Sequence, residues 1–398
     1  MGIELALQGF DGDRTFTSGE AVTGSVLLKL DQPTTVSDIT ICLHGSVKTS
    51  LVEKGSPFIL GNDLPTVAEE NHQLFKVSNV LFPPRDLPQL SKSYTLSKRE
   101  YSFPFEICFP QARNHSDAQF PPSFSSRSEK HSAEANIEYV LTIELRRPGR
   151  FRRRIEVERQ LDYLPSDAAP VWPASLGSGP HIRQAALCVH SLVSTPAGAE
   201  IPVLILEGIL PSPPVLYAGR NLPVQLRIRS LPTQQNYTIP IELQHIAIFL
   251  RSTTAIVTGS HPISWNSSRA LVKLKGLGEH IVSCRDVDSI TEINSSILEN
   301  TIVPKVPPSF NSNAVEQKYS LEVEAEFSLG NTKLNMVKIA IEVDVRSGCC
   351  SENGAISHHT TEGPGYLDLF GAFGSGVDRQ PPPCYSPAIM GFWNKSIC

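Results

Sequence analysis

The stretch YSLEVEAEFSL, residues 319–329, alternates apolar and polar residues without a break. Successive side chains of a β-strand point to opposite faces, so this pattern predicts a strand with one face in a core and the other in water. In the run 337–345, every second residue is β-branched and apolar, and these form one face: Val337, Ile339, Ile341, Val343 and Val345. Gly330-Asn331 between the two runs is typical of a tight hairpin turn. Together these residues favour an all-β fold.

The same period of two extends over much of the chain. It occurs at 22–30, 39–45, 137–145 and 224–229. Each run predicts a half-buried strand, with residues such as Leu28 and Ile41 facing a core and Cys42 facing water. No run of about 12 residues has helical periodicity, although a short helix in 63–75 or 285–300 remains open. The 32 prolines and 26 glycines also suit short elements joined by turns.

Two changes of composition divide the chain. The segment 165–180, PSDAAPVWPASLGSGP, holds four prolines and has little periodicity, which is typical of a linker. After Val345 the alternation stops, and 348–398 is rich in Gly, Ser and Pro. Such a segment buries too little apolar surface to offset its ordering entropy, so we expect a disordered tail. The predicted organisation is two tandem antiparallel, immunoglobulin-like β-sandwiches, 1–164 and 181–347, followed by that tail.

Charge and cysteine usage exclude several classes of protein. The formal net charge of -5 does not suit a nucleic-acid binder. The eight cysteines form no CxxC, and none is spaced from a histidine as in a zinc site, so no cofactor is expected. The first residues lack the pattern of a secretory signal, which favours a cytoplasmic protein with free thiols over a secreted adhesion-type sandwich. There is no GxSxG, P-loop or HExxH motif, and we expect no catalysis.

Several segments in order along 1–347 resemble the arrestin family. They are FTSGEAVTGSVLLKL (16–30), ITICLHGSVKTS (39–50), YSFPFEICFP (101–110) with PPSF (121–124), ANIEYVLTIELRRPGRF (135–151), LYAGRNLPVQLRI (216–228), IELQHIAIFLRSTT (241–254) and VPPSF before YSLEVEAEF (306–327). The resemblance implies the arrestin fold with two sandwich domains. It also implies an adaptor that recognises the cytosolic tails of membrane transporters or receptors at the plasma membrane or endosomes.

The sharpest motif is a PPxY sequence formed by Pro382, Pro383 and Tyr385. WW domains bind such peptides as a polyproline II helix, with the tyrosine in a separate pocket. In the α-class of arrestins, PPxY tails recruit WW-domain HECT-type ubiquitin ligases, so the resemblance assigns the same partner to this motif. The alternative is a chance string in a proline-rich chain.

The second candidate is a basic segment around Pro148-Gly149. Six of its nine residues are arginines, at Arg146, Arg147, Arg150, Arg152, Arg153 and Arg154. Arginine binds phosphate in a bidentate manner, so the segment is a candidate contact for phosphorylated cargo or for an anionic membrane surface. The alternative is a solvated hairpin whose arginines pair with Glu144, Glu156 and Glu158.

Two weaker features lie near the C-terminus. Cys349-Cys350 are candidates for palmitoylation, and 367–370 (LDLF) faintly resembles a clathrin-binding peptide; ordinary thiols and an ordinary apolar stretch are the alternatives. At the level of function, the alternative to a ligase adaptor is a sorting scaffold of the wider arrestin clan, similar to retromer's arrestin-like subunit. The PPxY motif separates the two.

Overall fold

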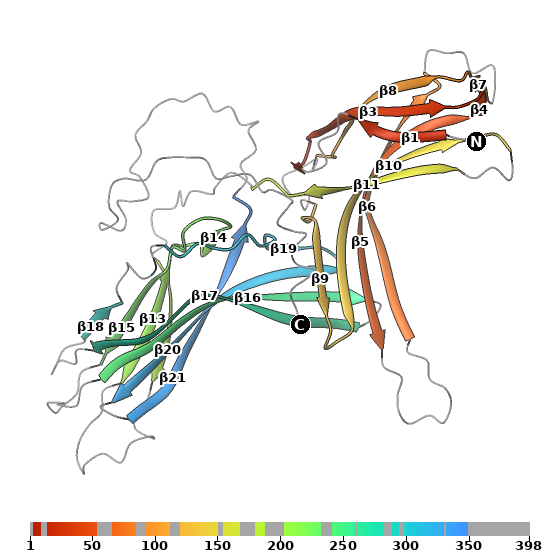
Figure 1. Ribbon diagram of the computed structural model, residues 1–398. Helices are drawn as coiled ribbons and strands as arrows, with labels where there is room; N and C mark the ends of the chain where they lie inside the picture. Colours follow the sequence, from red (N-terminus) through yellow and green to blue (C-terminus); the bar gives the residue numbers. More distant parts are fainter. Residues whose placement is uncertain are drawn as a thin grey trace, which may run out of the picture.

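The computed structural model describes residues 3–8, 14–53, 66–84, 93–111, 120–149, 154–167, 180–187, 203–231, 241–258, 261–281, 289–293, 298, 300–329 and 332–348. These residues form β-strands joined by turns and no helix, and they build two lobes (Figure 1). The all-β prediction is confirmed. The short helices left open for 63–75 and 285–300 are wrong for the residues that the structure describes as regular elements there, because Thr66–Phe82 and Ser289–Glu292 are strands. In this part of the chain nothing forms a helix able to cross a membrane.

The first lobe holds eleven strands in three sheets. One sheet has the order β1-β3-β8, the second has the order β2-β11-β10-β5-β6 with β9 also on β10, and a small sheet joins β4 to β7. The bounds are β1 Ile3–Gln8, β2 Thr15–Phe16, β3 Ala21–Leu30, β4 Thr34–Val36, β5 Asp38–Glu53, β6 Thr66–Phe82, β7 Tyr94–Leu96, β8 Glu100–Cys108, β9 Phe124–Ser128, β10 Ala133–Arg146 and β11 Ile155–Tyr163. All pairs are antiparallel except β2 with β11.

The second lobe repeats this arrangement. Its sheets have the orders β12-β13-β15-β18 and β14-β21-β20-β16-β17, with β19 also on β20. The bounds are β12 His181–Leu187, β13 Leu204–Leu210, β14 Val215–Tyr217, β15 Gln225–Ser230, β16 Ile241–Thr258, β17 His261–Ile281, β18 Ser289–Glu292, β19 Phe310–Asn311, β20 Val315–Leu329 and β21 Thr332–Arg346. Again one pair is parallel, β14 with β21. Thus β2, β5, β6, β9, β10 and β11 correspond to β14, β16, β17, β19, β20 and β21.

The strands at the ends of the two lobes begin and end close to where the sequence pattern predicts. β11 ends at Tyr163, β12 begins at His181, and β20 pairs with β21 from Leu329↔Thr332 onward. The exact domain boundaries remain predictions. The predicted tail, 348–398, lies outside the described residues except for Gly348.

Each lobe has its own apolar core, filled by the alternate residues of its strands. Leu28, Ile41 and Leu141 are fully buried in the first core, and Leu321 and Ile341 in the second. One expectation fails: Cys42, on the opposite face of β5 from Ile41, is also buried. Cys42 lies between Ser78 on β6 and Thr142 on β10, its partners on the two neighbouring strands. Side chains in the middle of the β2-β11-β10-β5-β6 sheet are therefore shielded from solvent even on the outer face.

Aromatic rings dominate the first core. The rings of Tyr139 and Tyr163 lie 4.7 Å apart between centroids, and Phe109 contacts both. Burial raises the pKa of both tyrosine hydroxyls. Gly45 makes room for this cluster, because a Cβ there would lie 2.8 Å from the Tyr139 ring.

Candidate functional site at the domain junction

The tail features predicted from sequence lie outside the described residues. This holds for Pro382, Pro383 and Tyr385, for Cys349-Cys350 and for 367–370. Their proposed roles therefore remain predictions.

The basic segment is described in part, and Arg150, Arg152 and Arg153 lie outside the description. Arg146 is bound to Glu144 at 2.9 Å and lies 3.8 Å from Asp38. Arg154 contacts Glu156 at 3.0 Å and Glu144 at 3.4 Å. The hydrogen bond to Glu144 and the negative charges of Asp38 and Glu144 raise the pKa of Arg146. For these two arginines the arrangement is that of the ion-paired hairpin, so any phosphate contact depends chiefly on the other arginines.

A duplicated Pro-Pro-Ser-Phe motif lies where the two lobes meet. It occupies 121–124 before β9 and 307–310 before β19. In the first copy the Tyr139 hydroxyl donates to the Pro121 carbonyl, and in the second the Tyr319 hydroxyl donates to the Pro307 carbonyl at 2.7 Å. The same local sequence therefore makes the same tyrosine-to-carbonyl hydrogen bond in both lobes.

The serine of each copy fastens the motif to the last strand of its own lobe. Ser123 donates its amide to the Tyr163 carbonyl at 2.8 Å, and its hydroxyl accepts from the Tyr163 amide at 2.9 Å. Ser309 makes the matching pair of bonds with Val345, at 2.7 and 2.8 Å. Each motif is thus tied to the strand with which its domain ends.

The phenylalanines of the two copies touch each other across the junction. The rings of Phe124 and Phe310 are 5.2 Å apart and nearly perpendicular, an edge-to-face arrangement that aromatic pairs prefer. Nearby, the Trp265 indole N–H donates to the Ser126 hydroxyl at 3.1 Å. Ile256 and Val315 of the second lobe are buried within the first lobe's core cluster. The lobes therefore share apolar surface at this junction (Figure 1).

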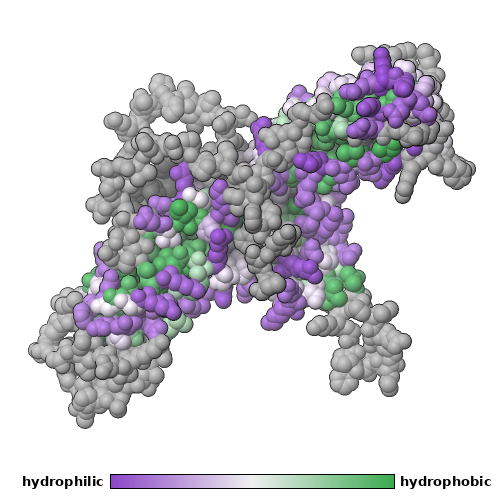
Figure 2. Space-filling view, viewed as in Figure 1, coloured by the Kyte–Doolittle hydropathy of each residue, from purple (hydrophilic) through white to green (hydrophobic). Residues whose placement is uncertain are grey.

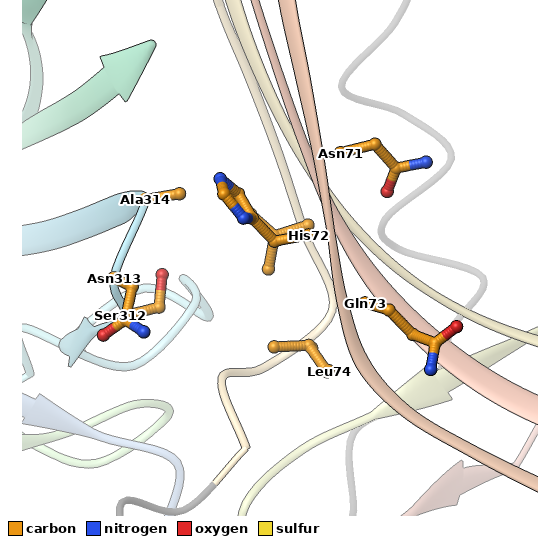
Figure 3. A pocket seen from close by; sticks show the side chains of 8 residues that line it. Asn71, His72, Gln73, Leu74, Ser312, Asn313 and Ala314 are labelled. Atoms are coloured by element: carbon orange, nitrogen blue, oxygen red, sulfur yellow. The ribbon is translucent and has the colours of Figure 1, made fainter. Parts of the chain in front are cut away.

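A hollow of about 330 Å³ opens beside this contact. It is lined on one side by Val47 and 71–74 of the first lobe, and on the other by 312–314 of the second. His72 and Leu74 point toward the Ala314 side, while Asn71 and Gln73 point away (Figure 3). Ser312 closes a turn with Val315 through bonds of its amide and hydroxyl, which fixes the second wall.

The hollow offers both polar and apolar groups to a ligand. The His72 Nε2 lies 3.0 Å from a Glu70 carboxylate oxygen, and its side chain is half exposed. Leu74 and Val47 add an apolar floor beside these polar groups. No group of three or more metal-ligating side chains occurs among the described residues. Figure 2 shows apolar residues among hydrophilic ones on the visible faces of both lobes.

The sequence alone does not identify this junction. Taken separately, the two Pro-Pro-Ser-Phe segments indicate only a likeness to the arrestin family. Their repetition, each followed by a strand with an inward tyrosine, is the signal that would have pointed to paired positions in two equivalent domains. Nothing in the sequence indicated that Trp265 lies at the same place.

Residues 7–162 match the family model described as arrestin (or S-antigen), N-terminal domain. This span covers the first lobe from the last two residues of β1 to the last residue but one of β11. No curated protein matches the chain significantly.

Proposed function

We propose that this arrestin-like protein, whose residues 7–162 match the arrestin N-terminal domain, acts as an adaptor linking membrane cargo to a WW-domain HECT-type ubiquitin ligase. A general adaptor or scaffold role in trafficking follows from the arrestin family. The ligase is the proposed addition, as are the cytosolic tails of transporters or receptors as cargo. The protein would work in the cytoplasm and be recruited to the plasma membrane or endosomes.

The observation that carries the ligase arm is the PPxY motif at Pro382, Pro383 and Tyr385. It stands outside the 7–162 match, as a recruitment peptide attached to a binding module should. In such an adaptor the chemistry belongs to the ligase, and the adaptor supplies effective concentration by holding ligase and cargo together. One copy of the motif implies weaker recruitment than several copies would.

The cargo arm is supported by the domain junction. Its hollow has walls from two domains and mixes an imidazole with apolar side chains, which suits a peptide segment carrying both polar and apolar groups. A His72→Ala, Leu74→Ala double variant should lose cargo binding while keeping WW-domain binding, because the two arms use separate parts of the chain.

The test of the ligase arm is direct binding of full-length protein to an isolated WW domain. Tyr385→Ala should weaken binding more than tenfold, about 2 kcal/mol, because the ring is the anchor of the interface. Cys384→Ser is the matched control, since that position of the motif is variable and the change should be nearly silent. Phosphorylated Tyr385 should bind poorly, because a dianion loses solvation in an apolar pocket.

In cells, Tyr385→Ala should leave the protein folded but stop ubiquitination of its cargo. If the wild-type chain binds no WW domain, or if Tyr385→Ala binds as well as wild type, the alternative is favoured. That alternative is a sorting scaffold of the arrestin clan that recruits no ligase. It is supported by the two-domain architecture and junction alone, which do not involve the tail.

A further inference from the structure

We propose that Asp167 is an interdomain latch: its carboxylate, just after the first domain ends, holds the backbone where the second domain ends. Asp167 follows β11 by four residues. Its carboxylate accepts the Gly348 amide at 2.7 Å and the Ser347 amide at 3.3 Å. The Ser347 hydroxyl also lies 3.5 Å from the Pro165 carbonyl.

The residues around the latch are shaped for it. Gly348 has a φ of 74°, in the left-handed region that favours glycine, so the extended path of the chain ends just past β21. Ser347 is buried, with 4% of its surface exposed. Arg346 adds an attractive positive charge, although its own nearest partner is Asp344 at 3.0 Å.

The latch completes a closed ring of contacts between the domains. Ser123 binds Tyr163, the last residue of β11, and Ser309 binds Val345 near the end of β21. Phe124 and Phe310, from the same two motifs, touch across the junction. Asp167 joins the two strand ends on the other side. A ring of this kind resists rotation of one domain against the other more than either contact alone.

Burial works against the charged form of the latch. Burial raises the pKa of the Asp167 carboxyl, even though the two amides, the Ser347 hydroxyl and Arg346 all act to lower it. The carboxylate is therefore costly to hold in place, and the hydrogen bonds offset that cost only in part. Opening would free both the linker after the first domain and the point from which residues beyond Gly348 leave the second.

The latch is independent of any ligase, and its test uses the full-length protein alone. Amide hydrogen exchange at Ser347 and Gly348 is compared among wild type, Asp167→Ala, Asp167→Asn and Glu342→Ala. Glu342 is an exposed acid on β21, the strand that leads into Ser347 and Gly348, and serves as the control. We expect exchange to rise at least about tenfold in Asp167→Ala, less in Asp167→Asn, which keeps one acceptor oxygen, and not at all in the control.

Phe310→Ala tests whether the contact links the domains. It should also raise exchange at Ser347 and Gly348, by a smaller factor, and its effect should not add to that of Asp167→Ala, because both break the same ring. Unchanged exchange in Asp167→Ala overturns the latch. A rise in Asp167→Ala with no response to Phe310→Ala overturns its interdomain role and leaves a local clasp. Asp167→Asn, which keeps the shape of the side chain, decides the matter if Asp167→Ala fails to fold.

Discussion

At the scale of single residues, the first domain depends on a missing side chain. Gly45 lies on β5 directly opposite Tyr139 on β10. The Tyr139 ring lies over the space where a Cβ of residue 45 would be. That Cβ would also lie 3.0 Å from the Phe75 ring. Because the Tyr139 hydroxyl is bonded to the Pro121 carbonyl, the ring has little freedom to move away. The glycine is therefore required by packing and not by backbone conformation.

Gly45→Ala should destabilise the first domain by about 1–3 kcal/mol, the usual cost of overpacking a rigid core. Gly219→Ala is the comparison, because Gly219 has a φ of 78° but open space around its Cβ position, so only backbone strain applies. Urea unfolding would measure both. An unchanged midpoint for Gly45→Ala would show that the aromatic cluster can shift, and that the ring is not held as described.

At the scale of elements, strand identity was predictable and strand partnership was not. Alternation in 319–329 and 337–345 marks the faces of β20 and β21 because burial on one face is a local pattern. The pairing of β2 with β11, or the meeting of Phe124 and Phe310, joins residues far apart in sequence, and no local pattern encodes such contacts. The buried Cys42 shows the same limit. The sequence pattern places Cys42 on the correct face of β5, but its shielding by both neighbouring strands depends on the order of strands in the sheet. Burial at this position raises the pKa of the thiol.

The candidate site was predictable only where it is a linear motif. The PPxY tail can be seen in the sequence because a WW domain binds a contiguous peptide. The junction hollow combines 71–74 with 312–314, and only the fold brings these together. The basic segment is an intermediate case: its arginines are contiguous, but the acids that pair with Arg146 come partly from β5, through Asp38.

The basic hairpin between β10 and β11 makes a prediction at this scale. Changing Arg150, Arg152 and Arg153 to Glu together should weaken binding to phosphoinositide-containing vesicles at least about tenfold at low salt, since each arginine near such a surface contributes about 1 kcal/mol. Arg154 is left in place because reversing it would put a third carboxylate beside Glu144 and Glu156. Because the sequence predicts a solvated hairpin, the thermal midpoint should barely change, since exposed charges contribute little to stability.

Vesicle co-sedimentation measures this effect. The control is Lys98→Glu with Lys130→Glu, two exposed cations elsewhere in the first domain. If wild type does not bind, or if the control loses as much binding as the triple variant, the hairpin is an ion-paired surface without a phosphate ligand.

At the scale of the whole molecule, duplication explains the junction. Two copies of one sandwich each bring a Pro-Pro-Ser-Phe motif and a terminal strand to the same place, so the domains meet through equivalent residues. Asp167 is outside this duplication, because it belongs to the segment between the copies. Control of the angle between the domains is therefore expected to lie in the linker, and pH is the simplest way to test it.

The sign of that pH dependence follows from burial. The pKa of Asp167 is raised in the folded protein, so the latched state binds a proton more tightly than an opened or unfolded chain. Stability from this group is thus greatest below the ordinary aspartate pKa of about 4, falls as pH rises toward the raised value, and is constant above it. Arg346, Asp344 and Tyr217 are the other charged or titratable groups beside the latch. Mild acid should therefore tighten the latch.

The measurement is the unfolding free energy of wild type minus that of Asp167→Asn, followed from pH 4 upward, since the subtraction cancels all other carboxylates. The difference should decline with rising pH and then level off, because asparagine cannot ionise and only the wild type must bury a charge as the proton leaves. A difference that instead grows with pH would mean that the two amides and Arg346 outweigh burial, so that the carboxylate's pKa is depressed. The latch would then be strongest when ionised, and acid would open it.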